Sequence, residues 1–216
     1  MALTAIIDVD GTLVDTNYHH TLAWARAFAR YGVAVPLWRI HSRIGMGGDQ
    51  LVGAAAGDEV ERALGDKVRV AWTEEFDAML GEIRPLPGAH ELLAALKRRG
   101  RALVLASSGQ PRHVEAFIDL VGARALADAW TTSSDVERTK PAPDLIGVAL
   151  DKAGVGEAVT VGDTPWDAEA SRRLGVPALA LRTGGFCDRE LTGAGAAAVY
   201  DDPADLLDQL DATPLG

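Results

Sequence analysis

The chain has 216 residues, of which 48% are hydrophobic and 24% charged, as is ordinary for a globular protein. Its net charge of −10 argues against a nucleic-acid or anionic-membrane partner, because both need basic patches. A phosphate substrate is not excluded, since an active site needs only local positive charge. The single cysteine, Cys187, excludes an intrachain disulfide. With no leader-like or membrane-spanning segment apparent, we expect a cytoplasmic protein.

The apolar run Leu3–Ile7 predicts a buried strand, and two carboxylates follow it directly. Asp8 and Asp10 lie two residues apart, so an extended backbone points both into the space beyond the strand end. Like charges that close destabilise each other unless a cation or a shared proton relieves them. Gly11 then allows a sharp turn. An exposed turn would explain the Asp and Gly residues, but not their attachment to a hydrophobic strand.

Residues 17–84 have helical texture and no convincing strand. Apolar residues recur there at helical spacing, as at Leu22 and Ala25. We therefore predict an all-helical cap domain inserted after the first strand of a core formed by residues 1–16 and 85–216. The predicted cap helices are Tyr18–Tyr31, Leu37–Arg43, Gln50–Ala55 and Glu59–Leu80.

From about residue 86 onward, short apolar runs alternate with amphipathic stretches of helical period. This alternation predicts a doubly wound, mostly parallel sheet with helices on both faces, that is, a Rossmann-like α/β core. The predicted strands are Arg101–Ala106, Ala129–Thr132, Ala158–Val161, Pro177–Leu181 and Ala196–Tyr200. The predicted helices are Ala89–Arg99, Arg112–Val121, Pro143–Ala153, Trp166–Leu174 and Pro203–Leu210.

Ligands of doubly wound sheets gather at the carboxyl ends of the strands, and polar residues follow several predicted strands there. Carboxylates suit a hard divalent cation, while hydroxyl and ammonium groups suit phosphate oxygens. The sequence therefore predicts metal-assisted phosphoryl transfer. The residues expected to converge are Asp8, Asp10, Ser107, Ser108, Lys140, Asp163 and Asp167.

These motifs, in this order and with a helical insertion after the first, resemble the haloacid dehalogenase superfamily of phosphatases and mutases. The resemblance covers nearly the whole chain, and Asp8-Val9-Asp10-Gly11-Thr12 is its strongest motif. Within the superfamily, the chain is similar to phosphoglycolate phosphatase-like and β-phosphoglucomutase-like enzymes. The resemblance implies a Mg²⁺ ion held by Asp8, by the backbone carbonyl of Asp10 and by Asp163. Asp167 would be a further ligand or an anchor of the site.

The resemblance also implies catalytic roles. Asp8 would attack phosphorus to form an aspartyl-phosphate, and Asp10 would protonate the leaving alcohol and then act as base toward water. This dual use requires that the Asp10 carboxyl can be neutral beside Asp8, which a crowded acidic site favours. The residues expected to bind the phosphoryl group are Ser107 and Lys140, with the backbone N–H groups of Gly11 and Ser108.

Two aromatic residues begin the predicted cap. His20 and Trp24 resemble β-phosphoglucomutase positions, where a cap-entry histidine supports the acid/base, so His20 is a candidate substrate-side residue. A structural role for His19 or His20 on an amphipathic helix is an equal alternative. The cap tryptophans Trp24, Trp38 and Trp72 are expected in the core rather than on the substrate.

Cationic residues of the cap separate the possible activities. A mutase needs a cap cation for its remote phosphate, and the glycine-rich turn Gly45–Asp49 has none, although His41 and Arg43 lie near. The turn is expected to be mobile and to approach the core site closely. A phosphonatase needs a cap lysine that forms a Schiff base, and Lys67 lies within a predicted long helix.

We therefore expect a phosphatase that acts on a small phosphorylated metabolite of the sugar-phosphate or phosphoglycolate type. A sugar-phosphate mutase is the alternative, and a regulator that binds a phosphorylated ligand without turnover is a third possibility. We expect no nucleic-acid or membrane partner and either a monomer or a dimer.

Overall fold

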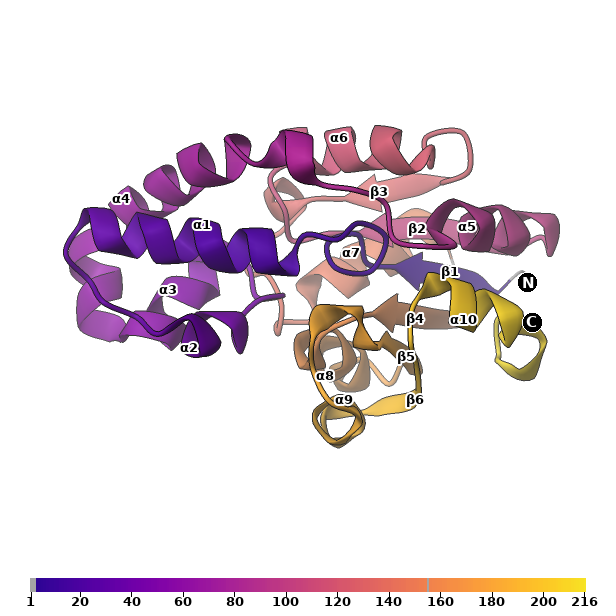
Figure 1. Cartoon of the computed structure of the whole chain (residues 1–216). Helices are drawn as coiled ribbons and strands as arrows, with labels where there is room; N and C mark the ends of the chain where they lie inside the picture. Colours follow the sequence, from indigo (N-terminus) through magenta and orange to yellow (C-terminus); the bar gives the residue numbers. More distant parts are fainter. Residues whose placement is uncertain (1–2, 155) are drawn as a thin grey trace.

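Six strands form one sheet in which all neighbouring strands are parallel, as the alternation along the chain predicts. The computed structural model describes residues 3–154 and 156–216. The strand order β3-β2-β1-β4-β5-β6 places the first strand in the middle of the sheet (Figure 1). The strands are β1 (Thr4–Ile7), β2 (Ala102–Ala106), β3 (Ala129–Thr131), β4 (Ala158–Gly162), β5 (Ala178–Leu181) and β6 (Ala196–Tyr200).

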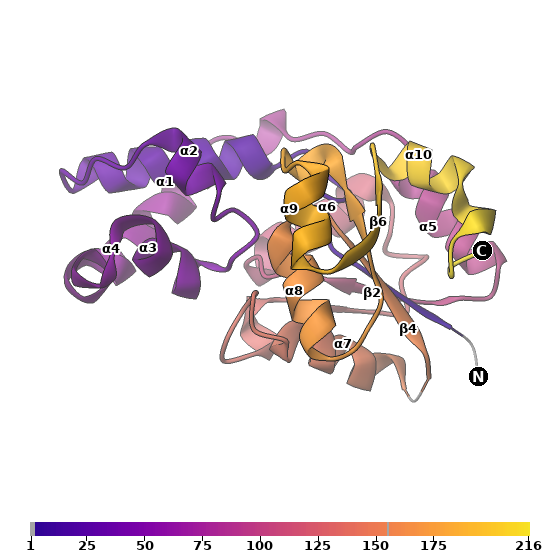
Figure 2. The same ribbon diagram turned by 90° about the horizontal axis from the view of Figure 1, so that it is seen from below.

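All four residues of β1 are buried because helices cover both faces of the sheet (Figure 2). Ala5 and Ile7 pack in one apolar cluster, whereas Ile6 packs in another on the opposite face. The first face is covered by α5 (Ala89–Arg98), α6 (Pro111–Val121) and α10 (Pro203–Asp208), and the second by α7 (Asp144–Ala153), α8 (Pro165–Arg173) and α9 (Asp188–Ala194).

Of the α-helices between β1 and β2 in the chain, the first four lie beyond the carboxyl ends of the strands (Figure 1). We call residues 17–84 the helical segment; its assignment as a cap domain stays a prediction. Trp24, Phe28 and Phe76 of this segment join the apolar cluster of the first sheet face. The helices are α1 (Asn17–Arg30), α2 (Leu37–His41), α3 (Gly48–Ala56) and α4 (Asp58–Asp77).

One local prediction was wrong, and one helix was not predicted. Trp38, expected in the core, is 69% exposed, because α2 has only five residues and buries only Ile40. The helix α9, which begins at Asp188 and whose start is capped by a hydrogen bond from the Cys187 N–H to Glu190, was not predicted. The sequence does not indicate α9, because this helix buries a single residue and its apolar residues do not recur at helical spacing.

Several helix ends also differ by a few residues from those expected. The turn Gly45–Asp49 is shorter than predicted, because α3 already begins at Gly48. Short 3₁₀ helices occupy Leu80–Glu82, Ser133–Asp135, Arg182–Gly184 and Leu210–Ala212. Every helix of the described residues is too short or too polar to cross a lipid bilayer.

Candidate active site

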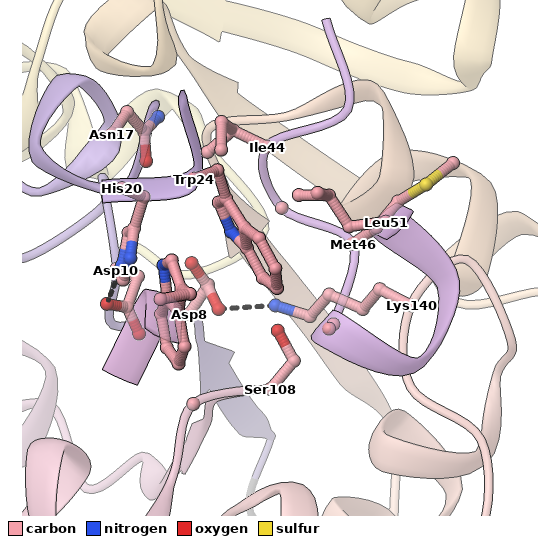
Figure 3. Close-up of a pocket in the computed structure, with 15 residues that line it drawn as sticks. Asp8, Asp10, Asn17, His20, Trp24, Ile44, Met46, Leu51, Ser108 and Lys140 are labelled. Atoms are coloured by element: carbon pink, nitrogen blue, oxygen red, sulfur yellow. Dashed lines mark hydrogen bonds and ion pairs between the residues drawn. The ribbon is translucent and has the colours of Figure 1, made fainter. Parts of the chain in front are cut away.

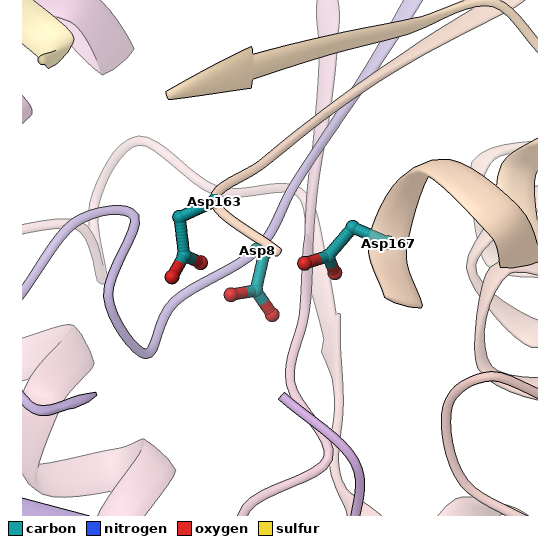
Figure 4. A group of neighbouring side chains, drawn as sticks. All are labelled: Asp8, Asp163 and Asp167. Carbon is teal, nitrogen blue, oxygen red and sulfur yellow. The ribbon is translucent and has the colours of Figure 1, made fainter. Parts of the chain in front are cut away.

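Three carboxylates meet at the carboxyl edge of the two central strands (Figure 4). Asp8 follows β1, Asp163 follows β4, and Asp167 lies in the first turn of α8. Because β1 and β4 are neighbours, residues far apart in the sequence become adjacent at this edge. One oxygen of each carboxylate lies within 4.8 Å of the others, and all three residues are buried.

Lys140 supplies the positive charge of this group. Its side chain is 3% exposed, and its Nζ donates a hydrogen bond to Asp8 (Figure 3) and lies 2.7 Å from Oδ1 of Asp167. Burial lowers the pKa of the ammonium, but the charges of Asp167 and Asp8 outweigh burial and hold that pKa above its ordinary value. Lys140 therefore stays charged and faces two of the three acids.

A single ammonium leaves an excess of negative charge. Burial, added to the charges of Asp167, Asp163 and Asp10, raises the pKa of Asp8 despite Lys140. Burial and the charge of Asp167 raise the pKa of Asp163 to about 7. Asp8 and Asp163, two buried carboxylates of raised pKa beside the buried Asp167, form a donor set that fits a hard divalent cation, which would relieve the excess charge.

Asp167 also anchors its neighbours. Its Oδ2 accepts hydrogen bonds from the Thr164 N–H at 3.1 Å and the Thr164 hydroxyl at 2.6 Å, while its Oδ1 faces Lys140. Both oxygens are thus engaged in fixing the start of α8 and the position of the Lys140 ammonium. This is the anchoring part of the role expected for Asp167.

Two residues that the sequence reasoning missed hold Asp163. The Thr12 hydroxyl donates to its Oδ1 at 2.8 Å, and the Asn17 amide donates to its Oδ2 at 2.6 Å. Thr12 belongs to the motif Asp8-Val9-Asp10-Gly11-Thr12, so its position in the sequence indicated that it lies near the site. Asn17 is the first residue of α1 and nothing in its local sequence indicates that it would reach β4.

Asp10 faces a different environment from Asp8. Its Oδ1 lies 2.9 Å from Nε2 of His20, and its Oδ2 accepts a hydrogen bond of 2.9 Å from the Ser107 hydroxyl. Burial raises the pKa of Asp10, but the hydrogen bond and charge of His20, with the Ser107 bond, outweigh it and lower that pKa. The expectation that crowding favours a neutral Asp10 was therefore wrong, because its nearest polar partners stabilise the carboxylate.

The two serines expected at the phosphoryl group lie differently. The Ser107 side chain is fully buried, and its oxygen donates to Asp10 and accepts from the Gly109 N–H at 2.9 Å. Ser107 thus orders Asp10 and the turn after β2 in this structure. Ser108 lines the cavity beside Asp8.

Gly11 does not offer its N–H to a ligand. That N–H donates to the Val14 carbonyl at 2.8 Å and the Thr16 hydroxyl at 3.0 Å, within the turn that leads to α1. The expected phosphate contact from this N–H is therefore corrected: the group is used by the turn. The positive φ of 74° explains why a glycine stands here.

A cavity of about 60 Å³ separates the acidic group from the helical segment (Figure 3). Asp8, Asp10 and Lys140 line one side, and Trp24 and Leu51 line the other. A second cavity of about 220 Å³ adjoins it. The two cavities share Trp24, Gly48, Trp72 and Ser108 as lining residues.

The glycines of the predicted close-approach turn bring the helical segment against the core. A Cβ added at Gly47 would lie 2.6 Å from Cβ of Thr139, the residue before Lys140. A Cβ at Gly45 would lie 2.6 Å from Cγ2 of Thr164, beside the acidic group. Side chains at either position would hold the segment away from the site.

The other cationic candidates of the helical segment lie outside both cavities. The His41 ring stacks on Tyr18, and its Nε2 lies 3.0 Å from the Gly184 carbonyl oxygen. The Arg43 guanidinium lies 5.8 Å from the Trp166 ring centre. Lys67 is exposed on α4. Among the described residues, Lys140 is the only lysine that lines either cavity.

The parallel sheet and the buried carboxylates at its carboxyl edge define an α/β enzyme site. A sequence profile of the haloacid dehalogenase-like hydrolases matches residues 3–175, and the chain belongs to this family. A hydrolase from Pseudomonas syringae has the same fold, with a TM-score of 0.92, 31% identity, and coverage of 97% of this chain and 98% of its own.

Two curated relatives carry more specific names. Validoxylamine A 7'-phosphate phosphatase from Streptomyces hygroscopicus is 29% identical over 197 residues, which cover 85% of this chain and 87% of the relative. Phosphonoacetaldehyde hydrolase from Bordetella pertussis is 31% identical over 199 residues, which cover 83% of this chain and 72% of the relative. The chain is therefore a hydrolase with a phosphatase among its relatives.

Proposed function

We propose that this hydrolase is a Mg²⁺-dependent phosphatase that acts on a small phosphorylated metabolite of the sugar-phosphate or phosphoglycolate type. The observation that carries the proposal is the buried Asp8 carboxylate, which faces a cavity and pairs with Lys140. A nucleophile beside a fixed cation and a metal-binding acid is the set that phosphoryl transfer needs. The family and the phosphatase relative support it.

Asp8 and Asp163 would hold the ion, with Asp167 fixing the adjacent Lys140. A bound Mg²⁺ would supply charge neutralisation between the Asp8 carboxylate and the phosphate dianion. The Lys140 ammonium would bind a second part of the same negative charge. These residues would thereby let two anions approach each other.

The two half-reactions use Asp8 and Asp10. A carboxylate oxygen of Asp8 attacks phosphorus, the bond from phosphorus to the alcohol oxygen breaks, and that oxygen takes a proton from Asp10. A water then gives a proton to Asp10 and attacks the phosphorus, which releases phosphate and restores Asp8. Because His20 hydrogen-bonds Asp10, the pair can hold the transferred proton on either partner.

The phosphonate activity of one relative fits the site poorly. A Schiff base needs a lysine amine that faces the substrate, and Lys67 is exposed on α4 and lines neither cavity. The mutase alternative shares the first half-reaction and differs only in what accepts the phosphoryl group. Supplying a hexose 1-phosphate with a bisphosphate primer separates the two: a mutase gives isomerised product, and a phosphatase gives free phosphate.

The test is phosphate release from para-nitrophenyl phosphate and a panel of phosphorylated metabolites. We expect Asp8→Asn to reduce turnover by at least about 10³-fold, because the nucleophile is lost. EDTA should abolish wild-type turnover and Mg²⁺ should restore it. The matched control is Asp15→Asn, because Asp15 is exposed and outside the acidic group.

Thermal unfolding must first show that both variants are folded. Substantial turnover by a folded Asp8→Asn variant would refute the proposed nucleophile. Turnover that EDTA leaves unchanged would refute the metal.

A further inference from the structure

The second cavity lies where the remainder of a bound substrate would extend. It shares lining residues with the cavity beside Asp8, so a group attached to a phosphoryl at Asp8 would reach it directly. We propose that it binds the alcohol part of the substrate and selects a polyhydroxylated ring that carries no second phosphate, either uncharged or bearing an amine. This inference rests on the proposed phosphatase function and adds a substrate class to it.

The wall common to both cavities is aromatic. The rings of Trp24 and Trp72 stack with centroids 5.0 Å apart and planes 17° apart. Trp24 and Trp72 are 3% and 9% exposed, and the apolar surface that they present to the cavities suits the C–H face of a ring. Hydroxyl groups of the ligand would find hydrogen-bonding partners around this wall, at Gln110, Ser133 and Thr139.

Charge around the second cavity argues against a second phosphate. Arg69 is the one basic residue among the described residues that line it. The Arg69 guanidinium lies 2.9 Å from Glu61 and 2.9 Å from Asp66, and donates to the Gly48 carbonyl at 3.1 Å. Its charge is thus already neutralised by two carboxylates.

Two further acids line the same cavity. Asp49 accepts hydrogen bonds from Thr139, and Glu137 is exposed at the rim. A phosphate dianion placed here would meet these carboxylates with no free cation to offset them. A hydroxyl or an ammonium group would instead find acceptors. The phosphoryl end differs, because Lys140 lies there.

The test compares three competitors of para-nitrophenyl phosphate hydrolysis that share one phosphate position: glucose 6-phosphate, glucosamine 6-phosphate and glucose 1,6-bisphosphate. We expect the bisphosphate to inhibit at least about tenfold more weakly than glucose 6-phosphate, a difference of about 1.4 kcal/mol. Glucosamine 6-phosphate should inhibit at least as well as glucose 6-phosphate. Glu137→Gln should reduce the ratio of the inhibition constants of glucose 1,6-bisphosphate and glucose 6-phosphate by about twofold or more.

The matched control is Glu91→Gln, which removes the same charge from an exposed site on α5 and should leave the ratio of the two inhibition constants unchanged. Equal or stronger inhibition by the bisphosphate would overturn the inference, as would failure of all three sugars to inhibit. Tight bisphosphate binding that Arg69→Gln abolishes would show that Arg69 leaves its acids for a phosphate.

The proposed function has a separate readout in this experiment. Hydrolysis of para-nitrophenyl phosphate that depends on Asp8 supports the phosphatase whatever the sugars do. Should that hydrolysis be absent, the proposed function fails, and calorimetric binding of the same three compounds still tests the cavity.

Discussion

The two sides of the site are built from different chemistry. On the sheet side, buried charges contact one another, as Lys140 does with Asp8 and Asp167. On the helical side, stacked rings such as Trp24 and Trp72 and a glycine turn form the wall. A buried charge network tolerates little change, because removal of one member leaves the others unpaired. An aromatic and polar wall can vary without that penalty.

This difference indicates that reaction and specificity are encoded separately. The reaction depends on residues at strand ends, whose positions follow from the sheet. In our proposal, specificity depends on the second cavity, which residues of the helical segment and of the core line together, and polar pairs join the two sides. Two of these pairs reach the acids themselves, Asn17 with Asp163 and His20 with Asp10. A third joins Asp77 of α4 to the start of α6.

The largest effect should come from breaking the charge network. Lys140→Met leaves three buried carboxylates without their ammonium, so we expect a loss of about 3–5 kcal/mol in the free energy of unfolding. Turnover should fall at least about 10²-fold, because the phosphoryl group loses a fixed cation. Thermal unfolding and phosphate release measure the two effects.

Added Mg²⁺ should raise the Tm of Lys140→Met more than that of the wild type, because the variant has more uncompensated charge. Lys67→Met is the control, since Lys67 is exposed on α4 and should change neither quantity. An unaltered Tm in Lys140→Met would show that the ammonium does not stabilise the buried acids. The sheet side would then be no more sensitive to substitution than the helical side.

A smaller effect should follow from cutting one link between the sides. His20→Gln removes the ring that lies 2.9 Å from Asp10 and stacks on Phe76 with centroids 4.0 Å apart. We expect kcat to fall about tenfold with little change in KM, because the substrate contacts remain.

The pH profile separates this positioning role from a structural one. His20 holds the pKa of Asp10 below its usual range, so its loss should move the limb of the pH–rate profile that reports Asp10 to higher pH. A profile that keeps its shape while kcat falls would mean that His20 acts only through packing.

The residues on the sheet side of the site could be predicted from the sequence, because their positions follow from local sequence patterns. An apolar run predicts a strand, parallel strands end at one edge, and the residues just past Ile7 and Gly162 therefore converge. Asp8 and Asp163 followed from this reasoning. The fold class followed from the alternation of strands and helices, which the six parallel strands confirm.

The partners of these acids could not be predicted, because helix packing sets them. Nothing local indicates that Asn17 reaches Asp163, or that Arg69 lies between Glu61 and Asp66 at a cavity wall. The lowered pKa of Asp10 was missed for the same reason. Its direction depends on a His20 ring that arrives from α1, whereas proximity along the chain suggested only repulsion from Asp8.

The smallest predicted effect concerns the link between α4 and α6, in which Asp77 lies 2.6 Å from Arg112 and 2.8 Å from His113. Asp77→Asn should cost about 1 kcal/mol at neutral pH, since the side chain is partly exposed and loses charge-assisted bonds. Burial raises the pKa of Asp77, but its bonds to His113 and Arg112 outweigh burial and lower it. Its contribution is therefore present above the unfolded-state pKa and lost as pH falls through the folded-state pKa.

The Tm difference between wild type and Asp77→Asn should thus be present at neutral pH and vanish in acid. Burial lowers the pKa of His113 despite its bond to Asp77 and favours its neutral form in the folded state, so both proteins should lose stability as His113 is protonated in acid. Asp208→Asn, an exposed change on α10, should leave Tm unchanged at both pH values. A Tm difference that persists unchanged in acid would mean that Asp77 contributes through shape and neutral hydrogen bonds, and that the helical side is joined to the core without charge.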